Sequence, residues 1–281
     1  ADLFYRVPHL LAPGETLAST EHSKGLGGKG ANMSVAIARA AARAVHIGAV
    51  GLDGRWAIDL LMEYGVDTRN IVQIDTPTGH AVIMVDTGGE NAILLFPGAN
   101  RAVTETHIAS ALEAATEADT FLFQNETSNQ ADGARLASER GLRVVYAAAP
   151  FDGDAVKAVL PLLDMLVMNQ IEADQLGAAM NKPLHDLPVR DIIVTLGGAG
   201  CRWINTDLGA DRHFPAIPVT PVDTTGAGDT FTGFLVAGLD RGLPMEQAIS
   251  LGQQAGAIMV TRYGTADVIP DLKDVQDARF G

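Results

Sequence analysis

The sequence predicts an α/β fold with a mainly parallel central sheet covered by helices on both faces. Short apolar runs alternate with helix-like segments through most of the chain, and this alternation is typical of parallel strands joined by helices. The 281 residues are 47% hydrophobic but only 5% aromatic, which suits a core of Val, Ile, Leu and Ala. We expect a single domain over residues 1–281, because α/β folds often reach this length as one unit.

Short apolar runs mark the buried strands of this sheet. The expected strands are Val45–Val50, Thr120–Gln124, Arg143–Ala148, Met165–Met168 and Ile192–Leu196. The helices expected between them are Trp56–Glu63, Glu105–Ala115, Ala131–Arg140 and Ala155–Val159. Two longer apolar helices, Ala227–Leu239 and Met245–Thr261, are expected in the last third of the chain, the second with Pro244 at its start.

Two segments depart from this alternation and predict a small β-sheet lid. His80–Asp86 and Asn91–Phe96 flank Thr87–Glu90 and have the pattern of a β-hairpin. Leu3–Val7 and Glu15–Thr20, joined through Pro13 and Gly14, form a second candidate hairpin. We therefore expect a lid built from about residues 3–20 and 78–97 beside the α/β body.

Charge and cysteine content exclude several classes of protein. The net charge of −14 argues against nucleic acid or an anionic membrane as a partner. It is compatible with ATP, since a nucleotide site needs only local positive charge and a metal ion. The single cysteine, Cys201, has no partner for an internal disulfide, so a reducing, cytoplasmic location is expected. No apolar stretch approaches the ~18 residues of a membrane helix.

The first glycine-rich motif is Gly27–Asn32, which precedes a helical run at Met33–Arg43. Glycines there let a ligand approach the backbone, and the helix start offers unpaired N–H groups. The glycine spacing and Asp53 about 20 residues later match a dinucleotide-binding fingerprint, but the preceding segment is polar where that fingerprint needs an apolar strand. No Ser or Thr follows Lys29, as a Walker A loop requires. Taken alone, the motif is better explained as a plain helix start with turn glycines.

The second motif is Asp223–Phe231, at the start of a predicted helix. The backbone amides of Gly226–Gly228 are free of bulky side chains and can close around an anion, where the helix dipole stabilises charge on a transferring phosphoryl group. Asp229 lies in the first helical turn, where a carboxylate can accept a proton from a hydroxyl. The alternative is that Asp229 only complements the helix dipole.

Together the two motifs resemble the signatures of the ribokinase (phosphofructokinase B-type) sugar kinase family. Shorter segments match further family positions in the same order and extend the resemblance over essentially the whole chain. They are Asp2-Leu3, Pro13–Thr16, Gly89–Asn91, Pro97–Asn100, Gln124–Glu126, Asn169–Glu172, Thr195–Gly200 and Val260–Gly264. The resemblance implies a ribokinase-like fold with a β lid, ATP as phosphoryl donor with Mg²⁺, and a homodimer through the lids.

The resemblance also implies roles for individual residues. Asp229 would be the base, and Gly226, Ala227 and Gly228 the anion hole. Asp2, Gly28, Lys29, Asn32 and Glu126 would join Asp229 in binding sugar hydroxyls; Lys29 as a solvated helix-start lysine is the alternative. The ATP site would comprise Asn169, Thr195, Gly197, Gly198, Gly200 and Gly228, and Glu172 would hold Mg²⁺ through water. For Asn169 and Glu172 the alternative is helix capping.

A potassium site next to the anion hole is also implied by the resemblance. Its ligands, mainly backbone carbonyls, would come from Asp223, Thr225, Met259, Arg262 and Gly264. Val268 stands where the family has a serine hydroxyl, so the site would lose one oxygen ligand. A second departure lies before Asp2, where the family has a central strand; we expect the sequence to be truncated there, because an empty central position would expose apolar backbone.

Several functions remain open from the sequence. The resemblance favours phosphorylation of D-ribose to ribose 5-phosphate, with a fructokinase-like or nucleoside kinase as alternatives. A nucleoside site needs aromatic rings to stack the base, and the lid offers only Phe4, Tyr5 and Phe96. A non-catalytic sugar or nucleotide sensor on this fold is the alternative from another class, and an NAD(P)-dependent oxidoreductase rests only on the glycine spacing. The seven histidines have no metal-ligand spacing and are expected to be surface or packing residues.

Overall fold

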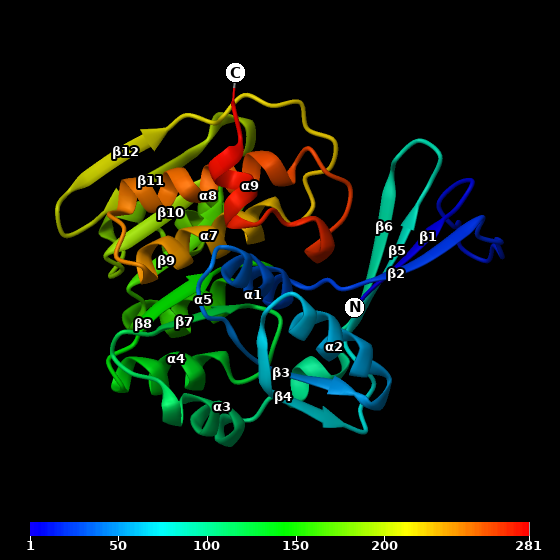
Figure 1. Ribbon diagram of the computed structural model, residues 1–281, viewed down its shortest axis with the longest axis horizontal. Helices are drawn as coiled ribbons and strands as arrows, with labels where there is room; N and C mark the ends of the chain where they lie inside the picture. The colour runs from blue at the N-terminus through cyan, green and yellow to red at the C-terminus, as the bar shows by residue number, and fades with distance from the viewer. Residues whose placement is uncertain (281) are drawn as a thin grey trace.

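The computed structural model describes residues 1–280 and has a three-layer α/β body with a separate lid (Figure 1). The last residue of the expected domain, residue 281, lies outside the described part. The main sheet has six strands in the order β12-β11-β10-β9-β8-β7, of which β7 to β10 are parallel. These strands are β7 (Thr120–Gln124), β8 (Arg143–Ala147), β9 (Met165–Asn169), β10 (Asp191–Thr195), β11 (Cys201–Asn205) and β12 (Ala210–Phe214). The mainly parallel sheet is therefore confirmed, with β11 and β12 added antiparallel at one edge.

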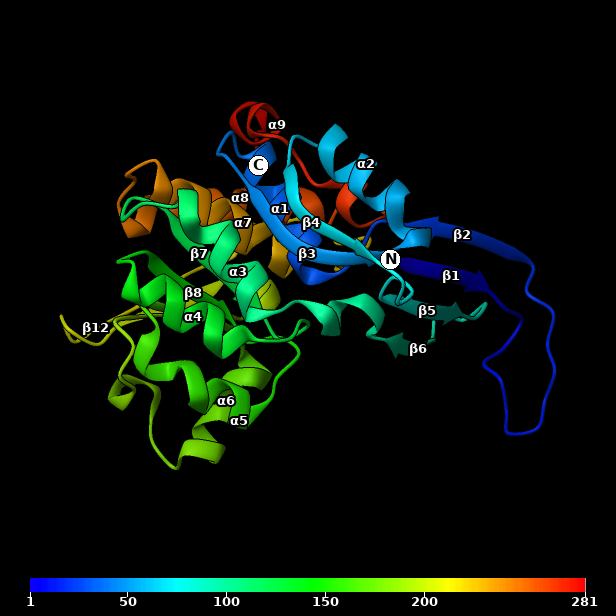
Figure 2. The same ribbon diagram turned by 90° about the horizontal axis from the view of Figure 1, so that it is seen from below.

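Nine α-helices lie within residues 1–280, and they cover both faces of this sheet (Figure 2). They are α1 (Lys29–Arg39), α2 (Arg55–Glu63), α3 (Glu105–Ala111), α4 (Gln130–Glu139), α5 (Gly153–Val159), α6 (Gln170–Met180), α7 (Ala227–Asp240), α8 (Met245–Met259) and α9 (Leu272–Asp277). Successive strand residues face opposite ways: Val144 packs with α3 to α6, and Val145 packs with α7 and α8. The apolar side chains of the parallel strands therefore pack into two hydrophobic cores, one on each face of the sheet.

A second, two-stranded parallel sheet lies apart from the main one. It consists of β3 (Val45–Gly51) and β4 (Asp67–Ile74). Within residues 1–280 no strand pairing joins β3 to β7, and residues of both strands line one cavity of about 780 Å³. Helix α1 packs against β3 and against β7, and so connects the two sheets. Within the described residues the two sheets are therefore not joined by strand pairing.

The lid is a four-stranded sheet in the order β2-β1-β5-β6, projecting to one side of the body (Figures 1 and 2). Its strands are β1 (Asp2–Arg6), β2 (Glu21–Gly25), β5 (His80–Val85) and β6 (Asn91–Phe96). The hairpin β5–β6 is confirmed, and β1 pairs parallel with β5 and antiparallel with β2.

The position of the second lid strand was predicted wrongly. We expected it at Glu15–Thr20, but that segment is loop, and the strand is the polar segment Glu21–Gly25. Residues 21–24 are exposed, so the strand needs no apolar alternation and carries no hydrophobic signal. The segment before Gly27 is thus a strand after all, yet it belongs to the lid rather than to a parallel sheet. The dinucleotide-binding fingerprint therefore still lacks its βαβ unit.

No helix within residues 1–280 is both long and apolar enough to cross a membrane. The single cysteine, Cys201, is buried in β11, where burial raises the pKa of its thiol to about 12.

Candidate active site

The two glycine-rich motifs, which lie near opposite ends of the sequence, meet in the structure. Asn32 in the second turn of α1 donates from Nδ2 to Oδ2 of Asp229 in the first turn of α7, at 2.8 Å. The helices pack closely behind this contact: a Cβ on Gly233 of α7 would lie 2.4 Å from the Cβ of Ala36. The motifs therefore form one site, as predicted, and the glycine at 233 is what lets the two helices approach.

Asp229 lies at the start of α7, close to the second glycine motif. Gly226, with φ of 71°, is the N-cap of α7, so Asp229 lies in the first turn of the helix. Its side chain is almost fully buried, with 8% exposed. Burial raises the pKa of Asp229, while the charge of Lys29 and the hydrogen bond from Asn32 act in the opposite direction. Burial therefore outweighs the two contacts that favour the ionised carboxylate.

The sugar-side residues gather around the first glycine motif. The carboxylate of Asp2 lies directly over Gly27, where a Cβ would be 1.8 Å from Asp2 Oδ2. Glu126, just after β7, accepts a hydrogen bond at Oε2 from the backbone N–H of Lys29, at 2.9 Å. Burial raises the pKa of both Asp2 and Glu126. The structure thus brings together the residues that the resemblance assigned to the sugar.

Lys29 supplies the positive charge of this acidic site. Its ammonium group lowers the pKa of Glu126, Asp229 and Glu172, against the larger effect of burial in each case. Lys29 is half-buried and lines the same cavity as Glu126 and Asp229.

The cavity of about 780 Å³ opens onto these residues. Its lining includes Asp2, Gly28, Lys29, Asn32, Glu126, Gly226 and Asp229. Asn32 is buried, and its Oδ1 has no hydrogen-bond partner among the described residues. A buried polar atom without a partner is costly, so Oδ1 is available to accept a hydrogen bond from a ligand hydroxyl.

The predicted nucleotide residues lie at the carboxyl ends of neighbouring strands. Thr195 at the end of β10 pairs in register with Asn169 at the end of β9, and ligands of open α/β sheets bind at this edge. Gly197 and Gly198 are exposed with open space around them. Gly200 has a packing reason to be glycine, because a Cβ there would lie 2.0 Å from Phe214 O. None of these residues lines the sugar-side cavity.

Glu172 takes part in a helix cap. Its Oε2 accepts from the backbone N–H of Asn169, and the Asn169 side chain accepts from the backbone N–H of Glu172. This reciprocal pair is the capping box that we considered as the alternative to metal binding. Within residues 1–280 no three His, Cys, Asp or Glu side chains gather into a metal site. A Mg²⁺ held through water and phosphate oxygens, as the resemblance implies, does not require such a cluster.

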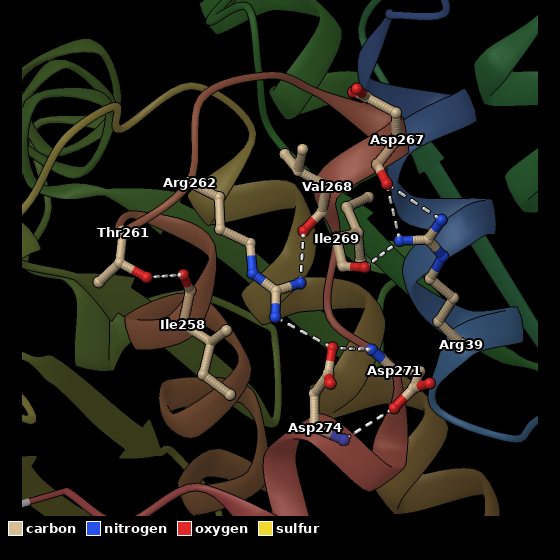
Figure 3. A network of polar contacts seen from close by, with 9 residues as sticks. All are labelled: Arg39, Ile258, Thr261, Arg262, Asp267, Val268, Ile269, Asp271 and Asp274. Atoms are coloured by element: carbon tan, nitrogen blue, oxygen red, sulfur yellow. Dashed lines mark hydrogen bonds and ion pairs between the residues drawn. The ribbon is translucent and has the colours of Figure 1, made fainter.

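The residues of the implied potassium site lie on two adjacent segments. The backbone N–H groups of Val222 and Asp223 donate to Val260 O at 2.7 and 3.2 Å, which brings the two segments together. Asp223 Oδ1 accepts from the backbone N–H of Thr225. At the position of the missing serine, Val268 O accepts from the Arg262 side chain at 3.0 Å (Figure 3).

Sequence analysis missed Thr265, which donates from Oγ1 to Leu26 O at 2.8 Å, just before the first glycine motif. No local pattern marks it, since its partner is 239 positions away.

The histidines behave as expected for surface or packing residues: His46 is bonded to Ser34, and burial lowers its pKa to about 4.

Comparison with known proteins agrees with this geometry. The model of the pfkB family of carbohydrate kinases matches residues 1–272. A ribokinase of Haemophilus influenzae is 33% identical, with 98% of this chain and 94% of that protein aligned. A ribokinase structure from Cryptococcus neoformans in complex with ADP has a TM-score of 0.84 and 31% identity, covering 98% of this chain and 96% of the other. A ribokinase structure from Arabidopsis thaliana complexed with ribose and ATP has a TM-score of 0.84 and 25% identity, covering 98% and 94%. The chain therefore belongs to the pfkB family of carbohydrate kinases.

Proposed function

We propose that this carbohydrate kinase transfers the γ-phosphoryl group of ATP to a hydroxyl of D-ribose, giving ribose 5-phosphate and ADP. The observation that carries the proposal is the position of Asp229, which is buried, lines the cavity together with Asp2 and Glu126, and lies in the first turn of α7. As the bond between the sugar oxygen and the γ-phosphorus forms, the bond from that phosphorus to the β–γ bridging oxygen breaks. Asp229 accepts the hydroxyl proton, and the amides of Gly226–Gly228 stabilise the charge on the phosphoryl group.

The choice of ribose rests on the relatives and on the character of the cavity. The Haemophilus relative is a ribokinase, and the Arabidopsis structure holds ribose and ATP. Carboxylate and amide groups of Asp2, Asn32 and Glu126 are suited to sugar hydroxyls. Of the three aromatic candidates for stacking a base, Phe96 lines the cavity, while Tyr5 packs on His22 instead. This favours a bare sugar over a nucleoside.

The metal ions of the site belong to the same proposal. Glu172 would orient Mg²⁺ through water, since it is only half-buried and lies in the first turn of α6, directly after the carboxyl end of β9. When bound with ATP, Mg²⁺ would neutralise negative charge on the phosphates during transfer. K⁺ would be held by carbonyls of the Asp223–Thr225 and Met259–Gly264 segments. A cytoplasmic location is also proposed, on the ground of the single buried cysteine.

A homodimer through the lid is supported by its exposed apolar strand. In β6 the side chains of Ile93, Leu94 and Leu95 are 56%, 67% and 65% exposed, and β6 is an edge strand with unpaired backbone. An apolar edge of this kind is a site for association. Sedimentation should give a dimer for the wild type and a monomer for Leu94→Asp; a wild-type monomer at micromolar concentration would remove this part of the proposal.

The decisive experiment measures ADP release with ATP, Mg²⁺ and a panel of ribose, fructose and adenosine. We expect the highest kcat/KM with ribose, and none above background with Asp229→Asn. Higher kcat/KM with fructose or adenosine would move the assignment to the fructokinase-like or nucleoside kinase alternatives. Sugar binding by calorimetry without any turnover would support the sensor, and would overturn the proposed reaction.

A further inference from the structure

The segment Val260–Ile269 lies between the two loops of the active site. At one end Val260 O accepts two backbone hydrogen bonds from Val222 and Asp223, just before the anion loop Thr224–Gly228. At the other end Thr265 donates from Oγ1 to Leu26 O, just before the sugar loop Gly27–Lys29. The segment therefore contacts the residues immediately before each of the two loops.

Two arginines fix the backbone of this segment (Figure 3). Arg39 reaches from α1 and donates to the carbonyl oxygens of Asp267 and Ile269. Arg262 donates to Val268 O at 3.0 Å and to Asp274 Oδ2 in α9 at 3.1 Å. The carbonyl oxygens of Asp267, Val268 and Ile269 thus all accept hydrogen bonds from guanidinium groups. These charge-assisted bonds fix the backbone of the segment.

Thr265 transmits this support to the sugar loop. Its side chain and that of Leu26 are each only 6% exposed, so the hydrogen bond between them is protected from water. Without the hydroxyl, Leu26 O would be left in a buried place without this donor, which is unfavourable. The loop that follows tolerates little movement, because Gly27 already touches the Asp2 carboxylate and Lys29 N–H is bonded to Glu126.

We infer that Thr265 is a positioning residue for sugar binding. Through its hydrogen bond to Leu26 O it holds the backbone of Gly27–Lys29 in the position at which Asp2 and Glu126 can bind the sugar. The inference rests on the proposed function, since it is expressed in the affinity for the sugar. We expect the effect mainly on sugar affinity, because Gly27–Lys29 follow Leu26 directly, whereas Asp229 is reached only through the side chain of Asn32, further along α1.

The test compares Thr265→Val, which keeps the shape and removes the donor, with Thr265→Ser, which keeps the donor. We expect Thr265→Val to raise the KM for ribose on the order of 10-fold, with kcat and the KM for ATP changed less than about twofold. Thr265→Ser should stay within about threefold of wild type. The matched control is Thr206→Val, because Thr206 Oγ1 also donates to a backbone carbonyl, that of Val189, at 3.0 Å; it should leave the ribose KM unchanged.

An unchanged ribose KM in a folded Thr265→Val protein would overturn the inference, as would Thr265→Ser being as impaired as Thr265→Val. If Thr265→Val does not fold, Arg39→Gln takes its place, since it loosens the same segment from the side of α1. It should raise the ribose KM in the same direction, and an unchanged KM would contradict the inference. Failure of the proposed function is separate, because it appears as wild-type protein that does not turn over ribose at all.

Discussion

The sugar side and the nucleotide side of the active site are built in different ways. On the sugar side Asn32 and Asp229 are only 5% and 8% exposed and are bonded to each other across 197 positions of sequence. On the nucleotide side Asn169 and Gly197 are exposed, and Asn169 is held by its own helix cap. On the buried sugar side, contacts between residues far apart in the sequence determine where the charged groups lie. On the open nucleotide side, the local backbone geometry of each segment determines the positions of the residues.

Because of this difference, we expect the activity to respond to changes of charge mainly on the sugar side. Burial raises the pKa of Asp2, Glu126 and Asp229, and Lys29 lowers it for the latter two. Substitutions there should change the rate and its pH dependence. Substitutions on the nucleotide side should change only the requirement for ions.

The largest effect is expected at the buried base. Asp229→Asn keeps the shape and the contact with Asn32 but cannot accept a proton, so kcat should fall at least ~100-fold while ribose affinity changes little. Stopped assays of ADP release with calorimetric ribose binding measure both. The control is Asp240→Asn, the same change at the other end of α7, which should keep turnover within about twofold. Near-normal turnover of Asp229→Asn would remove Asp229 from the mechanism.

The next effect is a pH shift caused by Lys29. Its charge favours the ionised form of Asp229, so Lys29→Met should raise the pKa of Asp229 further. Because the ionised form is the active base, the acid limb of the kcat/KM profile should move to higher pH, with a loss of about tenfold in kcat/KM at neutral pH. Lys24→Met is the control, since Lys24 lies over the Trp56 ring and not at the base. An acid limb that stays in place would show that Lys29 does not act on Asp229.

A smaller effect is expected at Glu172 on the open side. Glu172→Gln can still take part in the capping box but loses its charge, so the Mg²⁺ concentration for half-maximal rate should rise about fivefold. Asp152→Ala removes the cap of α5 and is the control for loss of a helix cap, which should cost about 1 kcal/mol in stability without changing the Mg²⁺ titration. An unchanged titration for Glu172→Gln would leave Glu172 with the capping role alone.

The smallest effect is expected at Val268. Val268→Ser restores a hydroxyl beside the anion loop, so activation by K⁺ relative to Na⁺ should increase about twofold. Val72→Ser, on the surface strand β4, is the control. Equal wild-type rates in K⁺, Na⁺ and a bulky organic cation at matched ionic strength would mean that protein contacts alone order the loop.

The sequence by itself determined the elements whose signals are local. Strands β7 and β10 and helix α7 lie within one or two residues of their predicted bounds. The reason is that the spacing of apolar residues in buried strands and helices is visible within a short stretch of sequence. The two glycine motifs and the acidic residue after the second were visible for the same reason.

Only the tertiary structure decided what has no local signal. The polar strand Glu21–Gly25 was missed because it is exposed and has no alternation of apolar and polar residues. The contacts of Asn32 with Asp229 and of Thr265 with Leu26 join residues 197 and 239 positions apart, and a single polar side chain does not indicate its distant partner. The burial that raises the pKa of Asp229 likewise arises only when α1 and α7 pack together, since desolvation is a property of the assembled site and not of the residue.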